Sequence, residues 1–256
     1  MSPKVLVLRA PGVNCDEETA YAFAQAGATP LRLHVQELLA HPARLGGFQI
    51  LCLPGGFSYG DDIASGRVLG NQLRLKLTDA LEEFRAAGKL VLGICNGFQV
   101  LMKTGLLDVD DAGGPQATLT WNDHGRYEAR WVRVSTAPSA CVFLRGMEQF
   151  ELPIAHAEGK IMFRDAAAQD QILGAGRGVL KYVNERGEVA TQFPANPNGS
   201  IAALAGLCDS TGRIFGLMPH PERFISPQQH PSWTRGPERK EGAGLQVFRN
   251  AVEYFA

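Results

Sequence analysis

The chain has 256 residues, which is enough for one large domain or two small ones and for a core that needs no disulfide or metal. Its 45 % hydrophobic and 20 % charged residues exclude a wholly disordered protein. The 25 basic and 26 acidic side chains leave a formal net charge of −1, which argues against a dedicated nucleic-acid or anionic-membrane binder.

The five cysteines are scattered, and none forms a pair or cluster with zinc spacing. Neither a disulfide framework nor a structural metal is therefore expected. The first apolar run ends at Arg9 and is too short for the core of a signal peptide. The longest largely apolar stretch, 90–102, contains Asn96 and Gln99 and cannot span a bilayer. We expect a cytoplasmic protein without a membrane or nucleic-acid partner.

The first hundred residues alternate between strand and helix patterns. A first helix is expected to begin at Asp16 and to end near Gly27, and helical apolar spacing predicts a second helix over 68–87. Strands that read as unbroken apolar runs suit a parallel sheet covered on both faces. The strands predicted in this half cover 4–9, 31–35, 49–53 and 89–94.

From about residue 119 to 207, the pattern changes to short strands separated by Gly, Pro and Asn turns, with no strong helix between them. We expect these strands to extend the sheet in antiparallel fashion. They cover 131–134, 151–155, 179–183 and 201–207.

The last part returns to the first pattern, with a strand over 213–218 and a closing amphipathic helix over 245–255. Between them, 226–244 is rich in Pro, Gly and charge and is expected to be an exposed loop. No linker separates two halves of the chain. The predicted fold is α/β: one domain over 1–256, a three-layer sandwich whose mainly parallel, doubly wound sheet carries antiparallel additions.

The sharpest local signal is GICNG at 93–97, where an apolar strand meets a helix. Small residues on both sides allow a strained strand-to-helix turn that projects the Cys95 side chain away from the backbone. The positive end of the following helix favours a thiolate over a thiol. Cys95 is therefore predicted to be a nucleophile, and the alternative is a small buried apolar residue.

A thiolate nucleophile needs a base and a group that orients the base. His220 and Glu222 follow a predicted strand, and the carboxyl ends of parallel strands meet at one edge of the sheet. Gly55 and Gly56 follow another strand, where consecutive glycines let backbone N–H groups form an oxyanion hole. Taken alone, His220 and Glu222 also fit the start of a helix, and Gly55 and Gly56 also fit a plain tight turn.

In this order and with these flanks, the three segments resemble the class I (triad) glutamine amidotransferases. Within that class the chain is similar to the glutaminase subunits of phosphoribosylformylglycinamidine synthases, a family of purine-biosynthesis proteins. The resemblance covers essentially the whole chain, and FSYGDD at 57–62 separates this family well from other amidotransferases. The matching strings are GVNCD (12–16), PGGFSYGDD (54–62), GICNGFQ (93–99), HAEG (156–159), NPNGS (196–200) and MPHPER (218–223).

The resemblance implies that Cys95 attacks the side-chain carboxamide of L-glutamine and forms a glutamyl thioester. His220 would protonate the departing ammonia and then activate the water that releases glutamate. Glu222 would orient the imidazole of His220.

The same resemblance implies an oxyanion hole and a substrate contact. The backbone N–H groups of Gly56, beside Gly55, and of Asn96 would hold the tetrahedral oxyanion. Gln99 lies one helical turn beyond the nucleophile, so its amide would reach the α-amino or carboxylate group of glutamine.

The ammonia would pass to a separate synthetase subunit that converts formylglycinamide ribonucleotide to formylglycinamidine ribonucleotide. ATP and Mg are expected in that partner and no cofactor in this chain, which lacks a phosphate-binding Gly-Lys-Ser/Thr loop. Whether a small accessory subunit joins the complex stays open. The alternatives are another cysteine-nucleophile α/β hydrolase, an amidotransferase that serves a different acceptor synthetase, and a non-catalytic interaction subunit.

Four further residues carry weaker sequence signals. Cys15 has no base near it in the sequence and is expected to be structural. His230 has no partner pattern and is expected at the surface. His156, with Glu158, is expected either to line the glutamine pocket or to contact the partner.

Overall fold

The structure, a computed structural model, describes residues 2–235 and 239–256. Within these residues, nine strands form one sheet in the order β2-β1-β3-β4-β13-β12-β11-β8-β9. The first five strands run parallel to one another, and the other four join in antiparallel fashion. This confirms the predicted fold class. The parallel strands are β2 (Thr29–His34), β1 (Lys4–Arg9), β3 (Ile50–Leu53), β4 (Leu90–Ile94) and β13 (Ile214–Leu217).

Burial explains why most of the parallel strands read as unbroken apolar runs. Every residue of β3, β4 and β13 is buried, whereas the edge strand β2 is mostly exposed, with Leu33 its single buried residue. A strand covered by helices on both faces has no solvent side that would require polar residues. The apolar runs therefore predicted the centre of the sheet.

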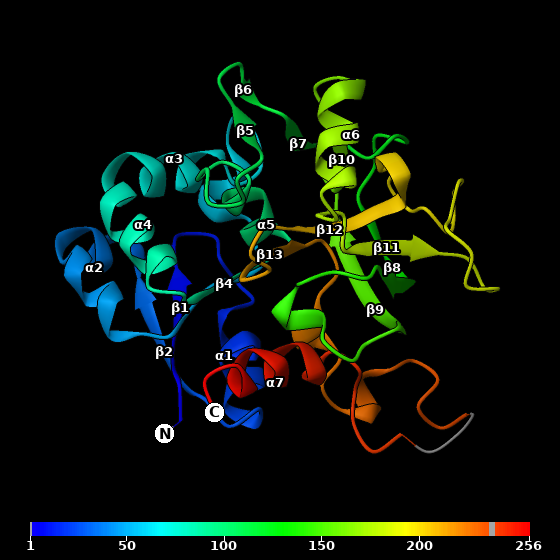
Figure 1. The fold of residues 1–256 in the computed structure, drawn as a ribbon. Helices are drawn as coiled ribbons and strands as arrows, with labels where there is room; N and C mark the ends of the chain where they lie inside the picture. The colour runs from blue at the N-terminus through cyan, green and yellow to red at the C-terminus, as the bar shows by residue number, and fades with distance from the viewer. Residues whose placement is uncertain (1, 236–238) are drawn as a thin grey trace.

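Helices cover the parallel half on both faces (Figure 1). Helices α1 and α7 pack together below the strands in this view, where the rings of Phe23 and Phe248 meet edge to face at 4.8 Å. Helices α3 and α5 lie above them, and α5 packs on β3, β4 and β13. Among the described residues, no helix is both long and apolar enough to cross a membrane. The helices of this half are α1 (Asp16–Gln25), α2 (Val35–Ala40), α3 (Arg67–Lys76), α4 (Thr78–Ala86), α5 (Asn96–Leu101) and α7 (Leu245–Glu253).

The single helix predicted over 68–87 is wrong in one respect, because the structure divides it into α3 and α4. Leu77 separates the two helices with a non-helical backbone (φ −126°, ψ 14°) and is itself buried. The break lets both helices bury their apolar residues, although their axes differ. A periodic apolar pattern does not reveal such a break, because the spacing continues across it.

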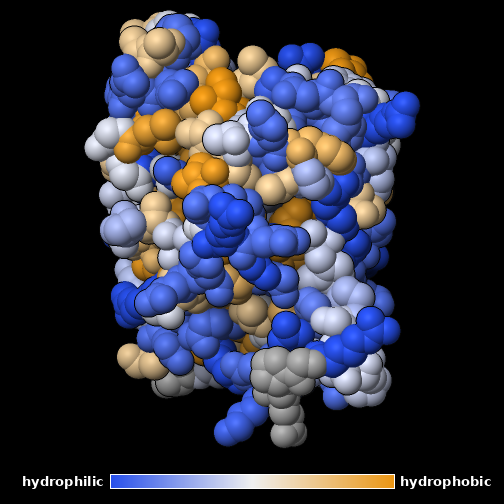
Figure 2. Space-filling model, turned by 90° about the vertical axis from the view of Figure 1, so that its right-hand side faces the viewer, coloured by the Kyte–Doolittle hydropathy of each residue, from blue (hydrophilic) through white to orange (hydrophobic). Residues whose placement is uncertain are grey.

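The antiparallel half occupies the right-hand side of Figure 1 and consists mainly of strands, as predicted. Figure 2 views the molecule from that side and shows a mostly hydrophilic face with separate hydrophobic patches. Two small ribbons lie outside the main sheet, β7 with β10 and β5 with β6. The strands of this half are β5 (Asp110–Asp111), β6 (Gly114–Pro115), β7 (Ala117–Thr120), β8 (Glu128–Thr136), β9 (Gln149–His156), β10 (Lys160–Phe163), β11 (Leu180–Val183) and β12 (Leu204–Cys208).

Two expectations for this half are wrong. A helix, α6 (Ala166–Gly174), lies between the strands and is capped by the Asp165 carboxylate, which accepts from the Ala168 N–H. Only two of its residues are buried, so it lacks the apolar stripe that identifies a helix in a sequence. The strand expected from residue 201 begins at Leu204, because 201–203 form a short 3₁₀ turn.

The segment 226–244 is partly packed rather than fully exposed. His230, expected at the surface, is buried against the rings of Trp131 and Phe224, and its Nε2 lies 3.2 Å from the Glu151 carboxylate. Residues 236–238 of the predicted loop lie outside the described residues.

Candidate active site

Cys95 stands between the end of β4 and the start of α5, as the elbow pattern predicted. Its backbone has φ 51° and ψ −107°, a strained conformation that is rare for a residue with a Cβ. The flanking glycines make the turn possible: a Cβ on Gly97 would lie 1.8 Å from the Leu53 carbonyl oxygen, and one on Gly93 would lie 2.7 Å from the Gly97 oxygen. The thiol of Cys95 donates to the Ala155 carbonyl at 3.6 Å.

His220 follows β13, the neighbour of β4 in the sheet, so the pairing of two strands brings it close to Cys95. The Cys95 N–H donates to the Leu217 carbonyl at 2.7 Å, and the His220 N–H donates to the Pro153 carbonyl at 2.8 Å. The imidazole Nδ1 lies 2.5 Å from Oε1 of Glu222. Both side chains are almost completely buried, with 2 % and 0 % exposure.

The electrostatics of this pair favour a charged imidazole. Burial lowers the pKa of His220, but the Glu222 carboxylate and the Cys95 thiol outweigh burial and hold that pKa well above its usual value. The Nε2 atom of His220 is buried and forms no hydrogen bond within the described residues. Since Nδ1 is engaged by Glu222, Nε2 is the ring nitrogen available for proton transfer.

The predicted oxyanion loop adopts a conformation that requires glycine. Gly56 has φ 144°, and a Cβ there would lie 2.7 Å from the Asn14 nitrogen. The Gly55 carbonyl accepts from the N–H groups of Asn14 and Cys15, which fixes the loop against the end of β1. Within the described residues, the N–H groups of Gly56 and Asn96 donate to no protein group. Two donors are therefore free for an oxyanion.

A buried amide network connects the elbow to the loop that follows β3. The Asn96 amide donates to Asp61 at 3.0 Å and to Gln99 at 2.9 Å, and its oxygen accepts from the Ser58 N–H at 3.0 Å. The Gln99 amide in turn donates to the Glu158 carbonyl at 2.6 Å. Both ends of the Gln99 amide thus already have protein partners, so a contact with substrate would require a partner exchange.

Sequence reasoning missed the part of Asp61 in this network. Burial raises the pKa of its carboxyl, and the nearby Glu158 raises it further. The network also includes a main-chain carbonyl, that of Glu158, which no side-chain pattern could have revealed.

The expectation that Cys15 has no nearby base is wrong. Its Sγ, a nitrogen of His220 and a carboxylate oxygen of Glu222 lie within 4.8 Å of one another. The topology holds a signal for this: β1 pairs with β3, so the residues that follow both strands lie at the same edge of the sheet.

The same three side chains also form a possible cluster of metal ligands. The Arg223 guanidinium donates to the Cys15 sulfur at 3.0 Å, and such a neighbouring cation opposes the binding of a second one.

His156, the last residue of β9, is buried, and its position explains its charge state. Its Nδ1 lies 3.1 Å from the Asn122 oxygen, while the Asn122 amide nitrogen donates to the carbonyls of Arg126 and His156. Since that amide orientation leaves its oxygen as the acceptor, Nδ1 of His156 carries the proton. Burial lowers the pKa of His156 to about 3, so the ring is neutral. Its neighbours Ala155 and Glu158 present carbonyls to the site.

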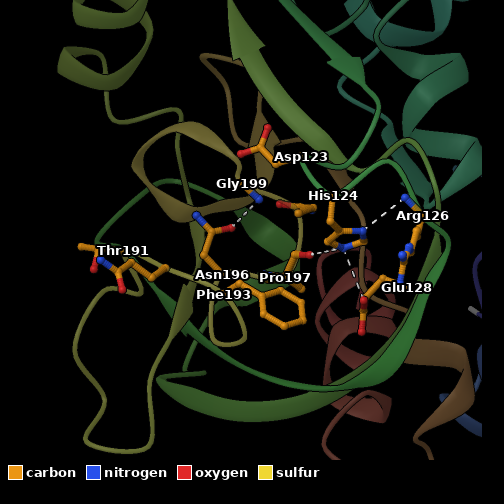
Figure 3. Close-up of a pocket in the computed structure, with 11 residues that line it drawn as sticks. Asp123, His124, Arg126, Glu128, Thr191, Phe193, Asn196, Pro197 and Gly199 are labelled. Carbon is orange, nitrogen blue, oxygen red and sulfur yellow. Dashed lines mark hydrogen bonds and ion pairs between the residues drawn. The ribbon is translucent and has the colours of Figure 1, made fainter.

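A separate pocket of about 680 Å³ lies in the antiparallel half (Figure 3). In it the His124 ring contacts Glu128 and the Pro197 carbonyl, and the Phe193 ring lies beside it. The residues lining this pocket do not include any of the predicted site residues. The cysteine, histidine and glutamate of the elbow region thus form a distinct, closed site.

This fold is that of the class I glutamine amidotransferases. The chain belongs to the family described as CobB/CobQ-like glutamine amidotransferase domain, whose model matches residues 2–255. Two curated relatives are named phosphoribosylformylglycinamidine synthase subunit PurQ. That of Dehalococcoides mccartyi is 46 % identical over 98 % of this chain and 97 % of its own length. That of Methanococcus maripaludis is 42 % identical over 99 % and 97 %.

Solved structures are similar as well. A chain in the structure of PurLQS from Thermotoga maritima is 28 % identical, covers 100 % of both chains and has a TM-score of 0.76. A glutamine amidotransferase structure from the same organism is 18 % identical over 99 % of this chain and 98 % of its own, with a TM-score of 0.56, which shows the fold alone.

Proposed function

We propose that this chain is the glutaminase subunit of phosphoribosylformylglycinamidine synthase, which hydrolyses L-glutamine and supplies ammonia for purine biosynthesis. The observation that carries the proposal is the strained Cys95 elbow beside the buried His220–Glu222 pair. Amidotransferases supply ammonia to many different synthetases. The relatives that match over nearly the whole chain are named as subunits of phosphoribosylformylglycinamidine synthase, which supports this synthetase as the one that receives the ammonia.

In the first half-reaction, the Cys95 thiolate attacks the side-chain carbonyl carbon of glutamine and forms a carbon–sulfur bond. The negative charge develops on the carbonyl oxygen, where the N–H groups of Gly56 and Asn96 stabilise it. Collapse of this intermediate breaks the carbon–nitrogen bond, and the protonated His220 gives its Nε2 proton to the leaving ammonia. A glutamyl thioester remains on Cys95.

In the second half-reaction, the neutral His220 removes a proton from water, and the resulting hydroxide attacks the thioester. The carbon–sulfur bond breaks, glutamate leaves, and the thiolate and the imidazolium are restored. Glu222 holds Nδ1–H throughout, which keeps Nε2 directed at the reacting groups and stabilises the imidazolium. This assigns general acid and general base to one ring.

Glutamine needs a path to the nucleophile, since Cys95 is only 5 % exposed. The loop after Gly56 is the element suited to move. Tyr59, Asp61 and Ile63 all have positive φ, and Ile63 is 81 % exposed. For a β-branched residue this conformation is an outlier that the surrounding structure must impose, so a shift of the loop releases strain.

The partner in this proposal is a synthetase subunit, with a small accessory subunit as a further candidate. Its support is the name of the relatives, as subunits of a synthase, and the likeness to a chain of PurLQS. The ATP and Mg of the overall reaction belong to the synthetase in this proposal. One domain over 1–256 also stays a prediction, supported by the continuity of the sheet through both halves.

The experiment that tests the proposal measures glutamate release from the purified chain with and without the synthetase subunit. An uncoupled glutaminase would waste glutamine, so we expect little release alone and strong activation by the synthetase with its substrates. Full activity alone, unchanged by the synthetase, would contradict the coupling. Absence of glutamate release under all conditions would contradict the glutaminase itself.

A further inference from the structure

Cys15 lies near the imidazole of His220, which carries out the proposed acid–base chemistry. A Cβ placed on Gly55 would lie 2.8 Å from Cε1 of His220 and 3.1 Å from the Cys15 sulfur, so both side chains lie close to Gly55, and the sulfur is within 4.8 Å of a ring nitrogen of His220. Cys15 is 1 % exposed. Its sulfur is therefore a buried neighbour of the His220–Glu222 pair.

Arg223 connects this sulfur to the carboxylate that orients the ring. Its Nη2 donates to the Cys15 sulfur at 3.0 Å, while its Nε lies 3.9 Å from Glu222 Oε1 and 3.8 Å from Glu18 on α1. The arginine follows the glutamate directly in the sequence. Its two anchors on the α1 side thus limit the movement of the Glu222 backbone and carboxylate.

The backbone of Cys15 performs a second task. Its N–H and that of Asn14 donate to the Gly55 carbonyl at 3.2 and 3.4 Å, next to the Gly56 N–H that faces the oxyanion position. One residue thus contacts the glycine loop through its main chain and the ring of the base through its side chain.

We propose that Cys15 and Arg223 form a positioning pair for the glutaminase reaction: the Cys15 sulfur, held by the Arg223 guanidinium, fixes the orientation of the His220–Glu222 pair relative to Cys95. The inference rests on the proposed function and adds two residues to it. Cys15 itself is not the nucleophile in this proposal, because its backbone (φ −101°, ψ 15°) lacks the strained elbow of Cys95. Burial raises the pKa of its thiol, although His220 and Arg223 oppose this effect.

The titration of His220 offers a readout that a purely structural cysteine would not move. Burial lowers the pKa of His220, whereas Glu222, Cys95 and Cys15 raise it. Loss of the Cys15 thiol should therefore lower that pKa and shift the acidic limb of the kcat profile to lower pH. Other titratable and charged groups surround His220 and Glu222. They are Cys15, Glu18, Cys52 on β3, Cys95, Tyr127 before β8, His156 and Arg223.

The experiment compares Cys15→Ala, Cys15→Ser and the control Cys141→Ala in the reconstituted complex with its synthetase. Cys141 is a buried cysteine that contacts Gly212, before the start of β13 and thus at the opposite edge of the sheet. We expect Cys15→Ala to lower kcat by about 10- to 100-fold, the effect of a small misplacement of a catalytic group, with little change in KM. Its acidic limb should shift to lower pH, Cys15→Ser should restore much of kcat, and Cys141→Ala should leave both unchanged.

The variant Arg223→Gln completes a double-mutant cycle. If the pair acts as one unit, the loss in Cys15→Ala/Arg223→Gln will be clearly smaller than the product of the two single losses. Independent losses, or a folded Cys15→Ala with the kcat and pH profile of the wild type, would overturn the inference. Circular dichroism and thermal unfolding check that the variants fold, and Cys15→Ser carries the test if the alanine variant does not. The proposed function fails separately, if the wild-type complex releases no glutamate.

Discussion

The parallel and antiparallel halves of the sheet contribute different things to the same site. The parallel half presents groups for the proposed chemistry directly after its strands: Gly56 after β3, Cys95 after β4 and His220 after β13. The antiparallel half contributes main-chain carbonyls from β9 and the turn beyond it, which accept from Cys95, His220 and Gln99. The parallel half thus supplies the reacting groups. The antiparallel half supplies the supporting wall, by which we mean the end of β9 and the turn beyond it, whose carbonyls hold the reacting groups in place.

This difference has a physical basis. Parallel strands all end at one edge, so their loops converge without special sequence features. The antiparallel strands end at alternating edges, and the end of β9 reaches the site, where the Pro153 and Ala155 carbonyls accept from His220 and Cys95. Substitutions at these positions of the parallel half should therefore abolish or strongly lower catalytic activity. Substitutions in the antiparallel half should instead lower the stability of the structure that holds the reacting groups.

The largest effect is expected for Cys95→Ala in the reconstituted complex. Glutamine-dependent synthesis should fall to background, while synthesis from added ammonia should persist, because only the ammonia supply depends on this residue. A glutamine analogue with an electrophile at the carboxamide position should label Cys95 and not Cys15, as mass spectrometry of peptides would show. Glutamine-dependent activity in the variant would rule out this nucleophile.

A smaller but still large loss is expected for the base. His220→Ala should lower the rate of glutamine hydrolysis by about 10²- to 10⁴-fold, because it removes both the acid and the base. Glu222→Gln should cost less, since an amide can still orient the ring but no longer stabilises its charge. Steady-state glutamate release measures both, and the reverse order of the two losses would contradict these roles.

Asn122→Ala tests the supporting wall. Asn122, in the loop between β7 and β8, is buried and bonds Arg126 in the same loop, His156 at the end of β9 and Gly159 in the turn that follows. Its removal leaves polar groups unpaired at a cost of about 1–3 kcal/mol each, so the free energy of unfolding should fall clearly. Denaturant unfolding measures this, with Asn184→Ala as a control of smaller effect, because the three side-chain hydrogen bonds of Asn184 lie in an exposed turn where water can replace them. Equal losses in both variants would show that the wall contributes no special stability.

The smallest expected effect is a pH dependence of stability caused by His156. Its pKa is about 3 when folded, against about 6.5 when unfolded, so the unfolded chain binds the extra proton between these values. Its contribution to stability is full above pH 6.5 and is lost as the pH falls. At pH 5 the loss should be about 2 kcal/mol relative to neutral pH.

The measurement compares denaturant unfolding of the wild type and His156→Asn at pH 7.5 and pH 5. His220 contributes in the opposite direction in both proteins, because a raised pKa favours the folded state at low pH, and it cancels in the difference. An equally large drop in the variant would show that His156 is not the group responsible.

Much of the fold and the proposed triad could be predicted because strong local rules govern them. Unbroken apolar runs mark covered strands, and glycines around Cys95 mark a strained elbow whose φ the structure gives as 51°. Because parallel strands end at the same edge of the sheet, the sequence alone also predicts that His220 lies near Cys95. The roles of these residues in the reaction stay proposals.

The features that could not be predicted depend on tertiary contacts. Leu77 interrupts a helical pattern because its burial outweighs local propensity, and α6 forms with only two buried residues. Cys15 gains its position near His220 from the pairing of β1 with β3, which requires knowledge of the strand order. Likewise, the carbonyl that meets the Cys95 thiol belongs to a backbone that carries no sequence signature.

The adjacency of β4 and β13 has a consequence for biosynthesis. The Cys95 N–H is hydrogen-bonded to Leu217, three residues before the proposed base His220, yet almost half of the chain lies between Cys95 and His220. A growing polypeptide that has passed residue 95 but not residue 220 carries the thiol without its imidazole. Because the long-range ladder must close before the two groups meet, glutamine cleavage becomes possible only after nearly all of the sheet has been synthesised and paired.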